Sequence, residues 1–355
     1  MSTLSKSEAS YIRTSLLSTP PLRADGRALL DYRPIALETG IAPLANGSAR
    51  INIGLKESSS SSRANKAGVG VGGTEVIGAV KLEVEDVRDG SDGRDGGRVV
   101  CTVSCSPQSH SHLSPPALED LSSDLTHTLH STLSHHSLLP PNLSIIPGKK
   151  SWLINIDLLV LSDAGNLYDA LFLAAHAALH DTKVVRTRGV EYRPPPSTHQ
   201  VPKIDDSMNV DTDADEETGA GETQSGFDTR RLKPITDFEL DDYWDEGDPL
   251  GGSRPICITI NLVQKTHYLD ATPQEEQSTP LRLLLIYSFP PSPSHQALLQ
   301  GMKLLGGGEV ALEDVKKLIG EGEKYARDLY TALETKLKEE DVRRGRKARE
   351  KLGRS

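Results

Sequence analysis

The sequence has little cysteine and no long apolar run. Its three cysteines, Cys101, Cys105 and Cys257, form no C-x-x-C pair, so neither a disulfide framework nor a cysteine zinc site is indicated. No apolar run approaches the ~20 residues that a membrane-spanning helix needs, and the N-terminus lacks the uninterrupted apolar core of a secretion signal. The hydrophobic content of 36% is nevertheless enough to form a core. These features favour an intracellular protein that does not enter a membrane.

The negative charge of the chain is concentrated in one stretch. The formal net charge is −10, but residues 205–248 contain sixteen acidic and three basic residues, so the rest of the chain carries a formal charge of +3. Bulk acidity therefore does not exclude a nucleic-acid partner. Such a partner would need a local basic surface.

Local patterns predict alternating strands and helices with low-complexity insertions. A capped amphipathic helix is expected at 5–18, and two strands at 33–38 and 49–55 are expected to form a hairpin around Asn46-Gly47-Ser48. Strands at 74–87 and 99–104 indicate a second hairpin with an enlarged tip. Further expected strands are 151–161, 183–192, 255–263, 265–270 and 281–288, and further helices are 118–136, 164–180, 309–319 and 323–338. Blocks of strands followed by helices indicate an α+β fold.

The histidines raise the question of a metal site. Six of the eleven lie between His110 and His136, but on a helical wheel they do not converge on one side. His176 and His180 have the i, i+4 spacing of zinc-binding helices, yet Ala177 stands where the metalloprotease motif requires a glutamate. Ordinary helix histidines are the favoured interpretation. We predict no metal and no cofactor, with a metal-dependent hydrolase as an alternative.

A charged turn begins the most specific series of motifs in the chain. Residues 23–27 form Arg-x-Asp-Gly-Arg, which by itself indicates a local ion-pair and turn network. It is followed in order by Tyr32-Arg33, Glu38-Thr39-Gly40, Gly47-Ser48-Ala49-Arg50 and Val80-Lys81-x-Glu83-Val84. This series resembles the N-terminal half of the RNase PH-like subunits of the eukaryotic exosome ring. Residues 161–170 and 269–276 are similar to the group of ribosomal RNA-processing protein 42 within that family.

The Ser/Gly/Ala-rich and acidic low-complexity stretches are predicted to be disordered insertions. The resemblance implies an α+β fold of the RNase PH-like, two-lobed βαβ type. It divides the chain into an N-terminal helix and charged turn (1–31), an N-terminal lobe (32–192) with insertions at about 57–73 and 89–98, an acidic low-complexity insertion (193–236), a C-terminal lobe (237–340) and a basic tail (341–355). The residues that it implies as structural motif positions are Arg23, Asp25, Gly26, Arg27, Gly47, Ser48, Asp163 and Asp270.

The residues that active members use are partly missing. Those enzymes cleave RNA with phosphate, which requires arginines for the phosphate and carboxylates near the leaving oxygen. They carry Asp-Gly-Gly-Thr-Arg at the start of the second helix, whereas this chain has Leu167 in place of the arginine, and residues 115–147 contain no arginine. Asp270 and Glu275-Glu276 match the carboxylate-rich stretch, but 277–282 lacks the next acidic residue. We therefore expect no catalytic residues and no enzyme activity, with an active phosphorolytic 3′–5′ exoribonuclease as the alternative.

The resemblance also implies partners and a location. It implies a hexameric ring with other RNase PH-like exosome subunits, RNA-binding cap subunits, single-stranded RNA in a central channel, and a role in ribosomal RNA maturation in the nucleus, nucleolus and cytoplasm. A channel wall contacts backbone phosphates through arginine and lysine. The candidates for such contacts are Arg50, Lys81 and Arg282. The neighbouring subunits and the roles of the acidic insertion and the basic tail stay open.

Overall fold

The computed structural model describes residues 4–54, 73–87, 96–190, 237–240, 247–264, 266–290 and 297–352. The chain divides into two units, one made of Met1–Val185 with Glu246–Ser355 and the other of Arg186–Asp245. In the second unit the described residues form an antiparallel pair of β8 (Thr187–Val190) with β9 (Asp237–Leu240). The predicted insertion at 193–236 lies outside the described residues, and those at 57–73 and 89–98 lie mostly outside them.

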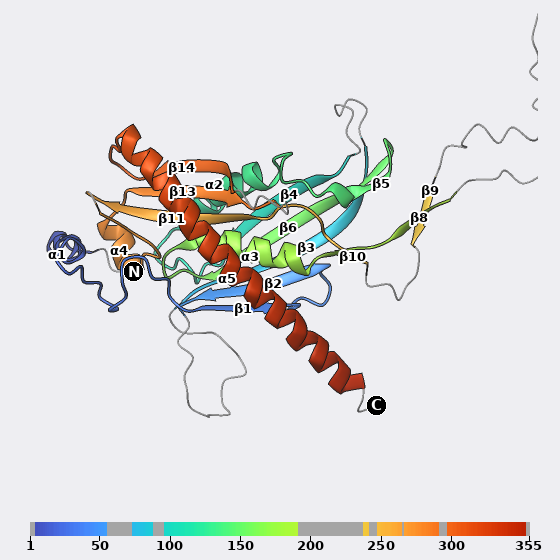
Figure 1. The fold of residues 1–355 in the computed structure, drawn as a ribbon, viewed down its shortest axis with the longest axis horizontal. Coiled ribbons are helices and arrows are strands. Elements are labelled where there is room, and N and C mark those ends of the chain that lie inside the picture. Colours follow the sequence, from blue (N-terminus) through green and yellow to red (C-terminus); the bar gives the residue numbers. More distant parts are fainter. Residues whose placement is uncertain are drawn as a thin grey trace, which may run out of the picture. The chain divides into compact units, whose positions relative to one another are not determined.

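The first unit contains a six-stranded sheet with β6 in its interior. Its strands are β1 (Ile35–Thr39), β2 (Gly47–Ile53), β3 (Thr74–Asp86), β4 (Arg98–Cys105), β5 (Ser144–Ile146) and β6 (Lys150–Ser162), in the order β1-β2-β3-β6-β4 with β5 on β6. The expected central strand at 151–161 is confirmed, since β6 pairs with β3 on one side and β4 on the other (Figure 1). The hairpin of β1 and β2 is also confirmed.

The expected hairpin of strands 74–87 and 99–104 is wrong. β6 lies between β3 and β4, antiparallel to the first and parallel to the second. The side chains of Ile154, Ile156 and Leu158 are almost fully buried, so the backbone N–H and C=O groups of β6 are also away from water and need a paired strand at each edge. The hairpin was expected because the two strands are close in the sequence. The need of the buried strand β6 for two paired neighbours overrides this preference.

The turn between β1 and β2 also differs from the prediction at Asn46-Gly47-Ser48. The strand already begins at Gly47. A Cβ at Gly47 would lie 2.3 Å from Thr182 Oγ1, at the C-terminal end of α3 (Leu167–Asp181). This glycine is thus required by close packing of the strand on the helix rather than by a turn.

Helix α3 joins the first sheet to a second one. It packs against β2 and β3 on one side and β11 on the other, and nearly all of its side chains are buried. The second sheet contains β12 (Thr266–Tyr268), β11 (Pro255–Val263), β13 (Arg282–Ser288) and β14 (Leu298–Leu305), in that order and all antiparallel. A short pair of β7 (Lys183–Val184) with β10 (Asp248–Pro249) completes the strands of this unit. The sheets and α3 share one continuous hydrophobic core.

Three further helices lie around this core. They are α1 (Lys6–Leu16), α2 (Pro115–Leu133) and α4 (Pro273–Ser278), and a 3-10 turn spans Pro141–Leu143. Ser5 caps α1 through a capping box with Glu8, which confirms the predicted helix start. Helix α1 packs on α4, where Leu16 and Tyr268 belong to a small separate apolar cluster.

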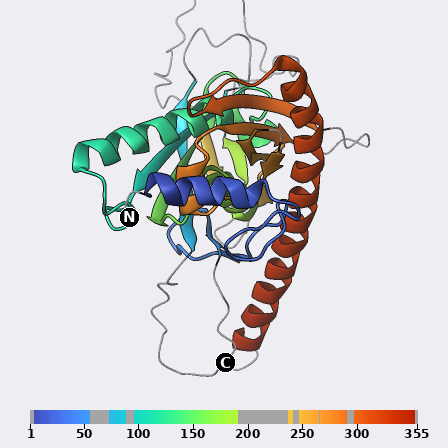
Figure 2. The same cartoon turned by 90° about the vertical axis from the view of Figure 1, so that its left-hand side faces the viewer.

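Helix α5 (Leu312–Leu352) replaces the two helices and the basic tail expected at the C-terminus. It runs diagonally across β11, β13 and β1 (Figure 1) and is uninterrupted in Figure 2. The break expected near residue 320 is absent. Gly322 is explained by packing instead, because a Cβ there would lie 2.6 Å from Leu285 of β13. Among the described residues, no helix is long and apolar enough to span a membrane.

Candidate functional site

The charged motif near the N-terminus meets Asp270, which follows β12. Its side chain is fully buried and its backbone has φ = +46°. Oδ2 accepts hydrogen bonds from Arg27 Nη1 (2.7 Å) and from the backbone and Nε nitrogens of Arg33 (2.7 and 2.9 Å). Oδ1 accepts from Arg33 Nη2 (2.6 Å) and Asn166 Nδ2 (3.2 Å). Burial alone would raise the pKa of Asp270, but the Arg33 and Arg27 cations outweigh it and hold the pKa below its ordinary value.

A second buried ion pair lies beside this carboxylate. Arg23 donates from Nε and Nη2 to the two oxygens of Glu275 (2.9 and 2.7 Å), which is the strong bidentate geometry. Arg23 also donates to the carbonyl oxygens of Leu269 and Asp270. Glu275 in turn accepts from the backbone of Thr272 and caps α4. Arg23 and Glu275 therefore fix the chain before and after Asp270.

The predicted turn at Asp25-Gly26-Arg27 supplies the third part of the network. Arg27 Nε donates to Asp25 Oδ2 at 2.6 Å, and the Arg27 backbone donates to Asp25 Oδ1 at 3.2 Å. Gly26 has φ = +76°, a conformation that favours glycine. Although burial acts to raise it, the pKa of Asp25 is lowered by its bonds from Arg27. This turn aims Arg27 at Asp270.

The loop before α3 is held by the same residues. Arg33 donates to the carbonyl oxygens of Ala164 (2.6 Å) and Gly165 (3.1 Å). The three consecutive backbone N–H groups of this loop also have partners, which are Thr74 Oγ1 for Ala164, Asp163 Oδ1 for Gly165 and Glu276 Oε1 for Asn166. The Glu276 carboxylate thus accepts a hydrogen bond from a backbone amide at the start of α3. The N-terminus of a helix is a position that otherwise attracts anions.

Asp169, in the first turn of α3, is a fully buried carboxyl group. Thr259 Oγ1 donates to its Oδ1 (2.7 Å) and the Tyr32 hydroxyl donates to its Oδ2 (3.0 Å). Burial raises the pKa of Asp169 to about 7, although these hydrogen bonds oppose the shift. This group titrates near neutral pH and joins α3 to β11 and to the segment before β1.

The predicted motif residues do not all belong to one site. Arg23, Asp25, Gly26 and Arg27 converge on Asp270, and Asp163 lies in the adjoining loop, where its Oδ2 is 3.0 Å from His110 Nε2. Gly47 and Ser48 lie at the other end of α3, about 22 Å away for a helix of fifteen residues. There the Ser48 backbone donates to Asp181 Oδ2 at 3.0 Å.

The three candidates for RNA contact each pair with a carboxylate. Arg50 on β2 lies 2.5 Å from Glu75, Lys81 on β3 lies 2.7 Å from Glu83, and Arg282 on β13 lies 3.1 Å from Glu276. Arg50 and Lys81 share the first sheet, whereas Arg282 borders the Asp270 network. They do not form one basic surface.

The histidines do not gather into one site. His176 is buried with its Nε2 3.4 Å from Glu334 Oε1 of α5, and His130 Nδ1 accepts from the Cys101 backbone. Within the ranges that the structure describes, no group of three histidine, cysteine or acidic side chains has the arrangement of a metal site.

The sequence patterns missed several members of this network. Asn166 and Thr74 gave no signal, because a single asparagine or threonine near a helix start is common. Asp169 could have been found, since it is the only charged residue between Leu167 and Ala175 in an apolar helix. Such a residue needs buried hydrogen-bond donors.

Comparison with known proteins identifies the family of this chain. The model of the 3′ exoribonuclease family (RNase PH), domain 1, matches residues 31–185. Over 213 residues, the chain is 30% identical to the exosome complex component Rrp42 of Sulfurisphaera tokodaii, covering 56% of this chain and 70% of that protein. The chain belongs to the RNase PH-like family of exosome components. Rrp42 of Saccharolobus solfataricus is 29% identical with the same coverage.

Solved exosome structures share the fold of this chain. A chain of the Archaeoglobus fulgidus exosome with RNA bound to the active site superposes with a TM-score of 0.60 at 20% identity, covering 92% of this chain and 97% of that one. A chain of an archaeal exosome core gives a TM-score of 0.56 at 20% identity, covering 92% and 96%. The expected RNase PH-like α+β fold is therefore confirmed.

Proposed function

We propose that the chain is a non-catalytic subunit of an exosome ring. In this role it completes a ring with other RNase PH-like subunits beneath RNA-binding caps and shapes part of the wall of a channel for single-stranded RNA. The proposal includes support of 3′–5′ RNA processing, ribosomal RNA maturation among it, in the nucleus, nucleolus and cytoplasm. Membership in the family of exosome components supports the assembly.

The state of Asp270 is the main support for the absence of catalysis. A carboxylate that places a metal ion or a proton near a leaving oxygen needs accessible lone pairs. The two oxygens of Asp270 offer about four lone-pair sites and already accept five hydrogen bonds. Asp270 acts as a structural anion between Arg27, Arg33 and Asn166.

The phosphate side of the site supports the same proposal. Leu167 stands where active members carry an arginine, and its side chain packs against the hydrophobic core. The nearby carboxylate of Glu276 accepts from the Asn166 backbone, and burial raises the pKa of Glu276 despite the opposing effect of Arg282. An incoming phosphate dianion meets a carboxyl group there instead of a free cation, which disfavours its binding.

An exposed apolar strand supports a role in assembly. Among the described residues β14 is the last strand of its sheet, and its large side chains remain about half exposed: Leu298 47%, Leu299 42%, Met302 53% and Leu304 44%. An apolar edge of this kind favours association with another chain. A ring neighbour is the partner that the family suggests.

Product analysis tests the proposal. The chain, purified with its ring partners, is incubated with single-stranded RNA, phosphate and magnesium, and nucleoside diphosphates are measured. We expect none from this subunit, and none from the Leu167→Arg variant, because that variant still has Asp270 engaged by arginines. If diphosphates are released and Asp270→Asn abolishes them in an intact assembly, the alternative of an active phosphorolytic exoribonuclease is restored.

A further inference from the structure

The two edges of the first sheet differ in how their backbone groups are satisfied. At one edge, β4 lies beside α2, and side chains of that helix accept hydrogen bonds from its amides. His130 Nδ1 accepts from the Cys101 N–H at 3.3 Å, and Thr126 Oγ1 accepts from the Val103 N–H at 2.9 Å. At the other edge, β1 is the last strand among the described residues. An edge strand whose N–H and C=O groups stay open is a template for pairing with a further strand.

The hydrogen bonds of β1 show which of its backbone groups are open. Just after the strand, the Gly40 N–H donates to the Ser48 carbonyl oxygen at 2.8 Å. Because successive residues of an antiparallel strand alternate in direction, every second residue before Gly40 also bonds to β2. The N–H and C=O groups of Ile35, Leu37 and Thr39 therefore point away from β2. No other described segment donates a backbone hydrogen bond to these groups or accepts one from them.

Two of these three residues can be reached from outside. Thr39 is buried beside Arg344 of α5, so α5 closes this end of the edge. Ile35 and Leu37 are only half-buried, and both line a cavity of about 400 Å³ between β1 and α5. Each residue carries one backbone donor and one acceptor. The open part of the edge therefore offers two donors and two acceptors beside a cavity.

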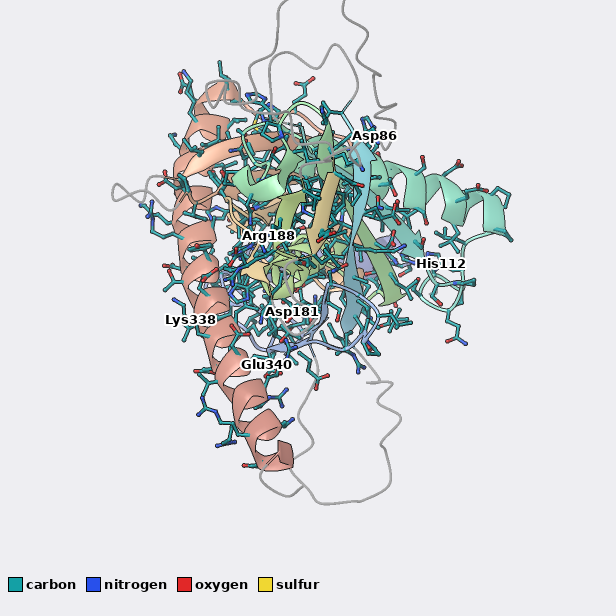
Figure 3. The ribbon with its side chains drawn as sticks, turned by 90° about the vertical axis from the view of Figure 1, so that its right-hand side faces the viewer. Asp86, His112, Asp181, Arg188, Lys338 and Glu340 are labelled. Atoms are coloured by element: carbon teal, nitrogen blue, oxygen red, sulfur yellow. The ribbon has the colours of Figure 1, made fainter. Side chains whose placement is uncertain are left out.

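The cavity is lined mostly by apolar side chains. Its floor includes Leu173 of α3, Leu269 after β12 and Leu333 of α5, all of which are buried. Figure 3 shows α5, on which Lys338 and Glu340 are labelled, passing beside the first sheet, and the helix contacts β1. The side chains of a strand added to β1 would alternate like those of β1 itself, so every second one would face this cavity. The cavity therefore fits an aliphatic side chain of an added strand.

The rim of the cavity carries one charge without a partner. Lys336 of α5 pairs with Glu339 at 2.7 Å. Asp328 is also exposed on α5, and it forms no ion pair with any residue that the structure describes. Its carboxylate attracts a cation and repels an anion. Charge complementarity therefore favours a segment with a lysine or an arginine over an acidic segment or a phosphate backbone.

We propose that the open edge of β1 docks an extended segment of another protein. The segment pairs with Ile35 and Leu37 as an added strand, places an aliphatic side chain in the cavity, and places a lysine or an arginine beside Asp328. This surface belongs to the first sheet, whereas β14, the edge proposed for a ring neighbour, belongs to the second sheet. The docked segment is therefore a partner in addition to the ring neighbours.

Peptide selection on the full chain, in the assembly in which it purifies, tests this surface. A display library of random peptides is screened for binders, and a labelled peptide from the selection is titrated by fluorescence anisotropy. We expect selected peptides that alternate apolar and polar residues and carry a lysine or an arginine. Asp328→Asn should weaken their binding about fivefold or less, which is the size of one exposed ion pair.

A side chain that fills the cavity should block the peptide. Ala332 is exposed on α5 and lines the cavity, so Ala332→Phe should weaken binding about tenfold or more by excluding the aliphatic side chain. Thr331→Phe is the matched control. Thr331 is the exposed neighbour of Ala332 and does not line the cavity, so this variant should keep the affinity of the unaltered protein.

Methylation of peptide amides tests strand pairing without altering the chain. Only every second amide of an added strand bonds to β1, so methylation of one alternate set should weaken binding about tenfold or more and methylation of the other set should have little effect. The inference is overturned if the two sets act equally, if no alternating peptide is selected, or if Ala332→Phe acts no more strongly than Thr331→Phe. Slow hydrogen exchange of the Ile35 and Leu37 amides in the peptide-free assembly also overturns it, because the edge is then already covered.

Discussion

Replacement of Asp270 by asparagine removes one buried negative charge and keeps the size of the side chain. Asparagine also tolerates the positive φ at this position, so the backbone adds little strain. The variant leaves Arg27 and Arg33 as buried cations without their shared carboxylate. The change therefore measures the electrostatic role of Asp270 with little contribution from cavity formation.

The expected loss of stability is large for a single isosteric change. Removal of one partner from a buried, hydrogen-bonded ion pair costs roughly 3–5 kcal/mol, and typical domains have only about 5–15 kcal/mol in total. Asp25→Asn is the control, because Asp25 pairs with the same Arg27 but its side chain is 34% exposed. An exposed pair contributes about 1 kcal/mol or less, so the control should be nearly neutral.

Urea unfolding of the chain at pH 7 measures both changes. A double-mutant cycle of Asp270→Asn with Arg33→Gln should show a coupling of more than about 1 kcal/mol, because the two side chains share two charge-assisted hydrogen bonds. The reasoning is refuted if Asp270→Asn and Asp25→Asn cost the same, or if the two members of the cycle are additive.

The pH dependence provides an independent check. The pKa of Asp270 is lower in the folded protein than its ordinary value of 3.8. Its stabilising effect is therefore fully present above about pH 4 and is lost as the pH falls through the folded pKa. The stability gap between the wild-type chain and Asp270→Asn should therefore narrow as the pH falls below about 4.

Three further changes are predicted. Burial raises the pKa of Asp169 to about 7, so the stability of the folded chain falls as the pH rises from about 4 to 7. Asp169→Asn should therefore flatten the pH profile of the melting temperature, and parallel profiles of variant and wild type would contradict this. Met302→Lys should weaken copurification with ring partners, whereas Leu312→Lys, which alters an exposed apolar residue outside β14, should not. Gly40→Ala should destabilise the chain by more than ~1 kcal/mol in thermal unfolding, because φ is +67° and a Cβ would lie 2.6 Å from the Arg344 guanidinium. Gly345→Ala is the control and should be neutral or stabilising, because its Cβ would enter open space within a helix.

The sequence predicted the elements whose information is local. The apolar strand at 151–161, the buried helix before residue 180 and the capped helix at the N-terminus each follow from periodicity and end signals within one segment. The order of motifs was also sufficient to indicate the RNase PH-like fold. Strand β14 was not predicted, because its alternation of apolar and polar residues is weak and part of its apolar surface remains exposed.

Pairing between distant segments was decided only by the tertiary structure. The separation of β3 from β4 by β6 depends on which neighbours bury the apolar strand, and no local pattern contains this information. Gly47 was assigned to a turn from its sequence context, whereas its actual role is contact with Thr182, more than a hundred residues away.

The role of the charged residues shows the same division. The sequence by itself determined that Arg27, Arg33 and Asp270 are present and that an arginine is missing at Leu167. It did not determine that both arginines share the single carboxylate of Asp270. Ion pairing depends on distances of a few ångströms between segments that approach each other only when the core has formed. The tertiary structure therefore decided which charges neutralise each other.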